Sequence, residues 1–138
     1  MKKAYLAVKF YQDCRNRKLI EQISESLHKA GFESLVLIRD FEKWGKVKFP
    51  PKKLMKLAFE QIDKSDLVVI EFSEKGIGLG IEAGYAYSKN IPIVIVAKKS
   101  SDISTTLHGV AKKTIFYDTP KELTEKFKSL KFLANLSN

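Results

Sequence analysis

One carboxylate lies among small residues, in a pattern that suits the close approach of a ligand. Glu82 comes two residues after the last glycine of the run Gly76–Ile77–Gly78–Leu79–Gly80, and small residues continue after it: Ala83, Gly84 and Ala86. Backbone amides beside the start of a helix can hold an anion or a sugar hydroxyl. We expect Glu82 in the first turn of a helix, where the helix dipole alone would also stabilise its charge.

The glycine run connects two strand-like segments. An apolar, β-branched run, Leu67–Ile70, precedes it, and a second run, Ile91–Val96, follows the helix that it begins. Two such segments joined by a helix form a βαβ unit with parallel strands. Ligands collect at the carboxyl ends of strands in open α/β sheets, which is where the glycines and Glu82 would lie.

The rest of the chain continues the alternation of strand and helix. Further strands are predicted at Ala4–Phe10, Glu33–Arg39 and Thr114–Tyr117, and helices at 16–30, 51–63, 103–111 and 120–136. Pro51 suits the first turn of its helix, and Gly31 follows the first helix as a stop. The pattern predicts an α/β protein in one domain, residues 1–138. We expect a Rossmann/flavodoxin-like three-layer sandwich with a five-stranded, mostly parallel sheet.

The loop between the second strand and the next helix is a candidate functional segment. Residues 40–51 are aromatic and basic and end in two prolines, which excludes regular helix there. Long loops that follow strands often carry function. Trp44 in this loop is either an anchor packed on the core or a side chain that stacks on a ligand base, and the sequence leaves both open.

Composition limits the classes of partner. The net charge of +9 comes from scattered lysines without a basic, aromatic-interleaved helix, so we expect an anionic small molecule and no specific nucleic-acid partner. No apolar run is long enough to cross a membrane, no signal peptide is expected, and the single cysteine, Cys14, fits a reducing cytoplasm. His28 and His108 lack metal-ligand spacing, so no metal is expected. The glycines match neither a dinucleotide fingerprint nor a phosphate loop, and no cofactor is expected.

Three stretches together resemble one enzyme superfamily. The segments AYLAVKF, SDLVVIEFSEKGIGLGIEAGYA and ISTTLHGVAKKTIFYD look like the nucleoside 2-deoxyribosyltransferase superfamily, which includes the 2'-deoxynucleoside 5'-monophosphate N-hydrolases. The similarity spans nearly the whole chain, and G-x-G-x-E-x-G-x-A is its most specific part. It implies that Glu82 is the nucleophile that attacks the anomeric carbon of the sugar. A carboxylate can do so by stabilising an oxocarbenium-like transition state and forming a covalent glycosyl intermediate.

The resemblance assigns roles to two further residues. Tyr5 matches the first-strand tyrosine that lies near the nucleophile in the family. As an alternative, Tyr5 is a strand residue that is simply buried in the sheet. Ser104 falls at the serine that reaches from a neighbouring subunit to the 5'-phosphate in the monophosphate hydrolases, which implies a homodimer or higher oligomer. As an alternative, Ser104 caps the short helix that it precedes.

The chain also departs from the family pattern. The aspartate that assists the leaving base falls eight residues before Asp66, where this chain has Ala58, and a phosphate-binding serine is replaced by Gly76. Lys9 and Arg39, at the ends of the first two strands, are candidate replacements for the phosphate contacts. Another carboxyl group would have to supply the acid, and nearby candidates in the sequence are Glu60, Asp63, Asp40 and Glu71.

Three hypotheses follow. In the first, the protein cleaves or transfers the N-glycosidic bond of a nucleoside or nucleoside 5'-monophosphate, with Glu82 as nucleophile. The backbone of Gly76, Gly78 and Gly80 shapes the sugar site, with Lys9, Arg39 or Ser104 at the phosphate. In the second, the same fold binds a nucleotide without turnover. The third, a basic nucleic-acid-associated protein, would require salt-dependent retention on DNA.

Overall fold

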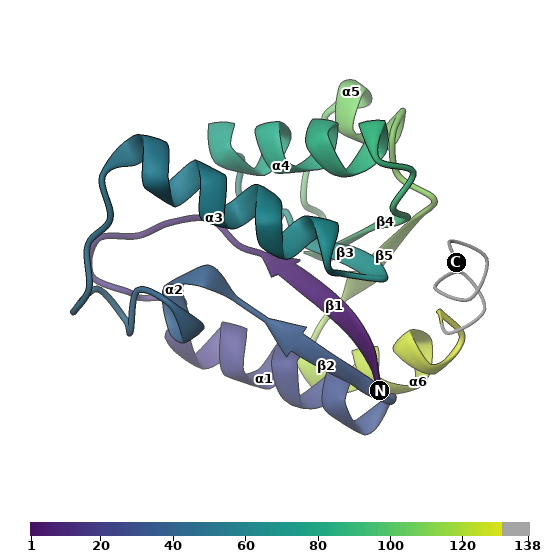
Figure 1. Ribbon diagram of the computed structural model, residues 1–138. Helices are drawn as coiled ribbons and strands as arrows, with labels where there is room; N and C mark the ends of the chain where they lie inside the picture. The colour runs from purple at the N-terminus through teal and green to yellow at the C-terminus, as the bar shows by residue number, and fades with distance from the viewer. Residues whose placement is uncertain (131–138) are drawn as a thin grey trace.

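A parallel β-sheet between two layers of helices makes up the computed structural model, which describes residues 1–130 (Figure 1). The five strands are β1 (Lys2–Ala7), β2 (Phe32–Leu35), β3 (Leu67–Glu71), β4 (Ile93–Lys98) and β5 (Lys113–Tyr117). Their order in the sheet is β2-β1-β3-β4-β5, and every neighbouring pair is parallel. This confirms the predicted fold class. The order reverses between β1 and β3, and such a switch point is where α/β sheets bind ligands.

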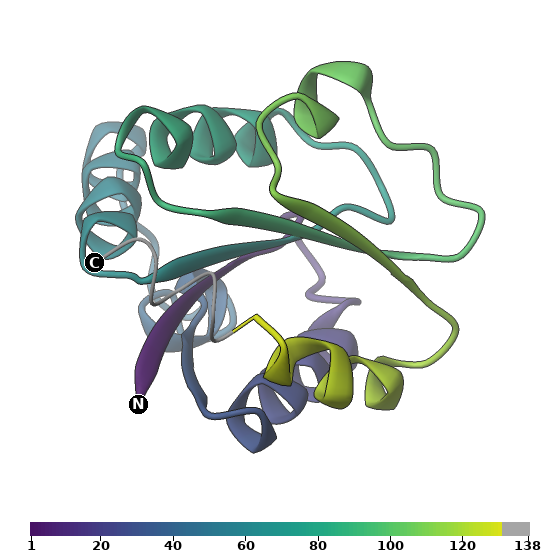
Figure 2. The same cartoon turned by 90° about the vertical axis from the view of Figure 1, so that its right-hand side faces the viewer.

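The helices divide between the two faces of the sheet, as Figure 2 shows. Helices α1 (Arg17–Lys29) and α6 (Leu123–Lys128) cover one face, and their apolar side chains form one core cluster with alternate strand residues. Helices α3 (Pro51–Asp63), α4 (Ile77–Ser88) and α5 (Thr105–His108) cover the other face and share a second cluster. A 3-10 turn, η1 (Pro120–Glu122), precedes α6.

The two-residue period of β1 determines where its tyrosine points. Ala4 and Leu6 belong to the core cluster beneath α1 and α6, whereas Tyr5 and Ala7 belong to the cluster beneath α3 and α4. Successive strand residues face opposite sides of a sheet, so these two sets alternate. Tyr5 is therefore directed toward the helical layer that carries Glu82.

Several predicted elements have other bounds in the structure, and the second strand and the closing helix differ most. The second strand ends at Leu35, and a short helix, α2 (Leu37–Asp40), replaces its predicted second half. The Asp40 carboxylate accepts a hydrogen bond from the Val36 backbone N–H at 2.8 Å, which stabilises this turn against the β propensity of the sequence. Of the predicted closing helix, η1 and α6 form the described part, and residues 131–136 lie outside the described residues.

Candidate active site

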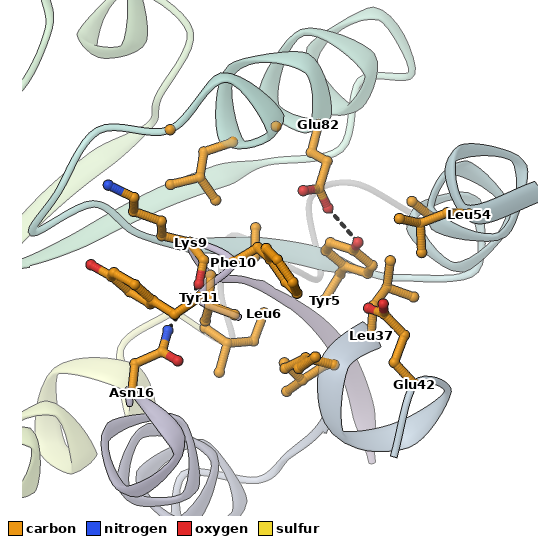
Figure 3. Close-up of a pocket in the computed structure, with 18 of the residues that line it drawn as sticks. Tyr5, Leu6, Lys9, Phe10, Tyr11, Asn16, Leu37, Glu42, Leu54 and Glu82 are labelled. Carbon is orange, nitrogen blue, oxygen red and sulfur yellow. Dashed lines mark hydrogen bonds between the residues drawn. The ribbon is translucent and has the colours of Figure 1, made fainter. Parts of the chain in front are cut away.

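A cavity of about 460 Å³ opens at the carboxyl end of β1, at the switch point (Figure 3). Such a volume lies within the range of pockets that bury small molecules. Most of its lining is apolar. The polar side chains in it are Tyr5, Lys9, Tyr11, Asn16, Glu42 and Glu82. The geometry thus joins the first strand, the loop after it, the segment 36–42 and the start of α4 around one site.

Glu82 and Tyr5 meet in this cavity. The Tyr5 side chain is buried, and its hydroxyl donates a short hydrogen bond to Oε2 of Glu82. Figure 3 shows the two side chains pointing toward each other from β1 and α4. The helix begins at Ile77, inside the glycine run, so Glu82 lies in its second turn and the prediction of a first-turn position is wrong. The helix dipole therefore does not account for this carboxylate.

The surroundings of Glu82 disfavour its charged form. Burial raises the pKa of the carboxyl group to about 7, and the hydrogen bond from Tyr5 acts in the opposite direction. The pKa of Tyr5 is raised far above its usual value by its own burial and by the adjacent carboxylate. Tyr5 therefore stays a neutral donor, while Glu82 exchanges its proton near neutral pH. A carboxyl group with such a pKa in a cavity is a candidate for chemistry.

The glycines before Glu82 leave free space beside the helix. A side-chain carbon at Gly78, Gly80 or Gly84 would meet no atom within 4 Å, and none of these residues has a positive φ. Neither backbone conformation nor packing against residues 1–130 explains these three glycines. Gly76 and Gly78 line the cavity with Glu82, and Gly76 also lines a second, adjoining cavity together with Gly80.

Lys9, a candidate cation for a phosphate, lies in the cavity wall just after β1 ends. Its Nζ is 3.4 Å from a carboxylate oxygen of Glu74, and it lies over the ring of Tyr11. Tyr11 donates a hydrogen bond to the same carboxylate at 2.6 Å, so Glu74 holds both side chains at the mouth of the cavity. Asn16, which sequence reasoning missed, donates to the Lys9 carbonyl at 2.9 Å and fixes the backbone there.

Arg39 lies outside the cavity, which corrects the proposal that it sits at a strand end beside the ligand. Because β2 ends at Leu35, Arg39 lies in α2 and not at the carboxyl edge of the sheet. Its guanidinium binds the Asp40 carboxylate at 2.8 Å and the hydroxyl of Ser24 at 2.8 Å. It also donates to the Ser34 carbonyl at 3.0 Å. Arg39 thus ties α1, β2 and α2 together.

Trp44 takes the first of its two predicted roles, since it packs against the core. The indole ring lies against the cluster beneath α1, and the guanidinium of Arg17 sits 4.5 Å from its centre. It does not line the cavity with Glu82. Trp44 is therefore an anchor for the loop 41–50 and not a stacking platform for a base in this site.

Ser104 does not line the cavity of Glu82. Its hydroxyl accepts a hydrogen bond from the Leu107 N–H at 3.4 Å, so it caps α5 as its alternative interpretation predicted. Ser104 also lines the second cavity, which has a volume of about 580 Å³ and includes Gly80 and Gly84. Within one chain, Ser104 and Glu82 do not share a site.

The wall where the family has its acid is apolar here. Ala58 lines the cavity beside Leu54 and Met55 of α3, so the substituted position does face the site. None of the four carboxyl groups suggested from the sequence as replacements lines this cavity: Glu60, Asp63, Asp40 and Glu71. Three of them are bound elsewhere: Asp63 to Tyr85, Asp40 to Arg39 and Val36, and Glu71 to Ser73 and Tyr117.

Sequence reasoning missed Glu42. This residue follows α2 and lines the same cavity as Glu82, and burial raises the pKa of its carboxyl group. The signal available in the sequence was coarse, because the loop 40–51 was a functional candidate but nothing in it identified this glutamate. Within residues 1–130, Glu42 and Glu82 are the carboxylates that line this cavity.

The described residues contain neither a candidate metal site nor a helix that could cross a membrane. Among residues 1–130, no three His, Cys, Asp or Glu side chains are grouped so that they could hold a metal ion. The helices described there are too short or too polar to cross a lipid bilayer.

The fold and site define a class of protein: a doubly wound parallel α/β domain with a tyrosine-bound carboxylate at its switch point. Sequence profiles of known protein families give no match to the chain, and neither do the curated proteins. Solved structures do match. The CMP N-glycosidase BcmB of Clostridium botulinum is 22% identical, with a TM-score of 0.68 over 93% of this chain and 98% of that one.

A second similar structure is the 2-deoxyribosyltransferase of Bacillus psychrosaccharolyticus, 14% identical, with a TM-score of 0.68 over 88% of this chain and 90% of that one. The response regulator TrrA of Thermotoga maritima, 18% identical, also matches with a TM-score of 0.63 over 96% and 99%. The chain therefore shares the fold of N-glycosidases and deoxyribosyltransferases, as the resemblance of its motifs indicated. Because a response regulator shares that fold as well, function has to be argued from the site.

Proposed function

We propose that this protein cleaves or transfers the N-glycosidic bond of a nucleoside or nucleoside 5'-monophosphate, with Glu82 as the nucleophile. The observation that carries the proposal is the Tyr5–Glu82 hydrogen bond inside a cavity of nucleoside size at the switch point. The similar structures include a CMP N-glycosidase and a deoxyribosyltransferase, which supports this chemistry over others known on the fold. The single free cysteine fits a cytoplasmic setting for it.

In this mechanism, an oxygen of the Glu82 carboxylate bonds to the anomeric carbon as the bond to the base breaks. The Tyr5 hydroxyl fixes the direction of the carboxylate through its hydrogen bond. Glu82 must be ionised to attack, and its pKa of about 7 keeps a substantial ionised fraction at neutral pH. A carboxylate that is partly desolvated by burial is a stronger nucleophile than one that is fully hydrated. Water or a second base then releases the sugar.

The two ends of the cavity suit the two ends of a nucleotide. Leu37, Leu54 and Met55 give an apolar wall against which a flat base can lie. Lys9, at the other side of Glu82 in Figure 3, supplies a positive charge for the phosphate end. The open space beside Gly78 lets the sugar approach the start of α4.

The decisive experiment is release of free base from a panel of nucleosides and 5'-monophosphates, with and without a second base, followed by chromatography. We expect the wild-type protein to release base, and Glu82→Gln to lose on the order of 10³-fold or more of that rate, because removal of a nucleophile is among the largest single losses in enzymes. Glu25→Gln, an exposed change on α1, is the matched control and should not alter the rate. Equal rates for wild type and Glu82→Gln would disprove the role of Glu82.

A nucleotide-binding module without turnover remains the second candidate. The observation in its favour is Ala58, which places a methyl group where the family has an acid. Absence of base release by the wild-type protein, together with a nucleotide-dependent rise in its melting temperature, would select this candidate.

We also propose that two copies of the chain complete the site. Ile77 and Ile81 of α4 are 86% and 49% exposed, and Gly80 and Gly84 leave open space beside them. This apolar helix face borders the cavity of Ser104, so a second copy packed there would bring its own Ser104 toward this chain's ligand. Light scattering should give at least twice the monomer mass, and Ile81→Lys should return the protein to a monomer. A wild-type monomer at micromolar concentration would contradict this assembly.

A further inference from the structure

We propose that Glu42 is the acid that protonates the departing base, a role that rests on the proposed N-glycosidic chemistry. Glu42 and Glu82 line one cavity from different elements, Glu42 from the segment after α2 and Glu82 from α4. In Figure 3 the two side chains enter the cavity from opposite sides, with Tyr5 between them. An acid and a nucleophile on opposite sides of the bond that breaks is the arrangement that glycoside cleavage requires.

The carboxyl group of Glu42 is free to act. Its side chain makes no hydrogen bond or ion pair to any residue within 1–130, in contrast to Glu82, which Tyr5 holds. It is close enough to Tyr5 for its charge to raise the pKa of the tyrosine hydroxyl. Leu37 and Leu54 lie near Glu42 in Figure 3, and Met55 lines the same cavity, so apolar side chains adjoin this carboxyl group. An uncommitted carboxyl group in an apolar wall retains its proton more readily than one in water.

The backbone that presents Glu42 is fixed. Its N–H donates to the Leu37 carbonyl at 2.9 Å, and its own carbonyl accepts from the N–H groups of Gly45 and Val47, both at 3.0 Å. The residues that follow it, Lys43 and Trp44, have φ values of 48° and 57°, in the left-handed region that side chains rarely adopt. Backbone strain of this kind gathers where a structure positions a functional group.

The loop is also anchored from outside. The Trp44 N–H donates to the Ile38 carbonyl at 2.7 Å, and its ring lies between the core and the guanidinium of Arg17. Trp44 thus acts on the site through the loop, by holding Glu42 at the cavity. This role explains why residue 44 is aromatic although its side chain does not line the cavity.

Glu42 takes the place of the acid that Ala58 cannot provide. Ala58 lines the cavity from α3, and Glu42 lines the same cavity from the segment after α2. The titratable groups that face this cavity with Glu42 are Tyr5 from β1, Glu82 from α4, and Lys9 and Tyr11 from the loop after β1. The α3 side of the cavity contributes only Leu54, Met55 and Ala58, which carry no charge.

Cleavage of the base involves one bond formed, one bond broken and one proton transferred. The Glu82 oxygen forms a bond to the anomeric carbon, the bond from that carbon to the base breaks, and its electron pair goes to the base. The proton of the Glu42 carboxyl group moves to the base, which leaves neutral, and Glu42 becomes a carboxylate. Glu42 then takes a proton from the attacking water, or from the incoming base, as the new bond to the anomeric carbon forms. The electron pair of the glycosyl bond returns to Glu82.

The test compares two leaving groups on the same sugar. One substrate carries the base that the wild-type protein releases fastest, and the other carries 4-nitrophenolate, which leaves without a proton. Glu42→Gln should lose about 10²–10⁴-fold in kcat on the first substrate and less than about tenfold on the second. Its rate on the first substrate should rise with pH to a plateau set by Glu82, without the fall at higher pH expected of the wild type. Formate should partly restore Glu42→Ala.

Other results overturn the proposal. Equal losses on both substrates, or an unchanged pH profile for Glu42→Gln, would show that Glu42 only shapes the site. A rate for Glu42→Gln within a few-fold of wild type on the first substrate would exclude any role in proton transfer. Glu25→Gln is again the control, and thermal unfolding of each variant confirms that it folds. If the wild-type protein releases neither base nor nitrophenolate, the proposed function itself fails, and the role of Glu42 fails with it.

Discussion

Within residues 1–130, two glutamates are each bound by a buried tyrosine of the sheet, and the two pairs have different surroundings. Glu82 accepts a hydrogen bond from Tyr5 in the cavity, and Glu71 accepts one from Tyr117 at the end of β3. Both tyrosines lie on strands of the sheet and are buried. The residue types and the contact are the same, so residue identity alone does not separate a functional pair from a structural one.

The difference lies in how completely each carboxylate is satisfied. Glu71 also accepts hydrogen bonds from the N–H and the hydroxyl of Ser73, at 2.7 and 2.9 Å. The same Ser73 hydroxyl accepts from the Lys98 N–H at 2.9 Å, so the network joins β3, β4 and β5. The only side-chain partner of Glu82 within residues 1–130 is Tyr5. A carboxylate with several donors stabilises the fold, and one with a single donor beside a cavity has lone pairs left for a ligand.

The largest effect expected from this contrast is a pH-dependent change in stability at Glu82. Its pKa is raised in the folded state to about 7 from 4.5, so the folded protein retains the proton more strongly than the unfolded chain. The stabilising contribution is therefore complete below the unfolded pKa and is lost as the pH rises through about 7. We expect Glu82→Gln to match wild type near pH 4 and to exceed its free energy of unfolding by up to about 3 kcal/mol near pH 8. Urea unfolding at several pH values measures this difference.

The matched variant at the other pair should behave in the opposite way. Glu71→Gln replaces a carboxylate that accepts three hydrogen bonds, so it should lower the free energy of unfolding by about 2 kcal/mol at neutral pH. Opposite signs for the two glutamine variants at pH 8 would confirm the contrast. If both variants destabilise the protein equally at every pH, Glu82 is a structural carboxylate like Glu71.

The sequence was sufficient to predict the sheet, and the resemblance of its motifs singled out one half of the candidate site. β-branched runs spaced by amphipathic helices predict the five strands. Tyr5 and Glu82 were singled out by the resemblance of their motifs, and the structure places their side chains in contact. The strand predictions succeed because burial and periodicity act locally along the chain. The side on which Tyr5 points also follows from the two-residue period of β1.

The other half of the site depends on features that sequence patterns do not encode. The run from Glu33 to Arg39 is predicted as one strand. In the structure the Asp40 carboxylate accepts a hydrogen bond from the Val36 N–H, and the chain forms α2 after Val36. That turn places Arg39 outside the cavity and brings Glu42 to it. The left-handed backbone of Lys43 is held by contacts distant in the sequence, since Trp44 beside it packs against α1. Tertiary contacts of this kind override local propensity.

The smallest effect in this comparison concerns the two tyrosine hydroxyls. The hydrogen bond from Tyr5 lowers the pKa of Glu82, so Tyr5→Phe should raise that pKa further and move the acidic limb of the rate profile to higher pH. We expect about a tenfold loss of base release at neutral pH, because less Glu82 is ionised and its direction is no longer fixed. Tyr117→Phe should leave the rate profile unchanged and lower the free energy of unfolding by about 1 kcal/mol. The proposed role of the Tyr5 hydroxyl would be wrong if the pH profile of the rate shifted in Tyr117→Phe or stayed unchanged in Tyr5→Phe. The Tyr5 hydroxyl would then not control the ionisation of Glu82. The distinction drawn between the two pairs would then have to rest on the cavity alone.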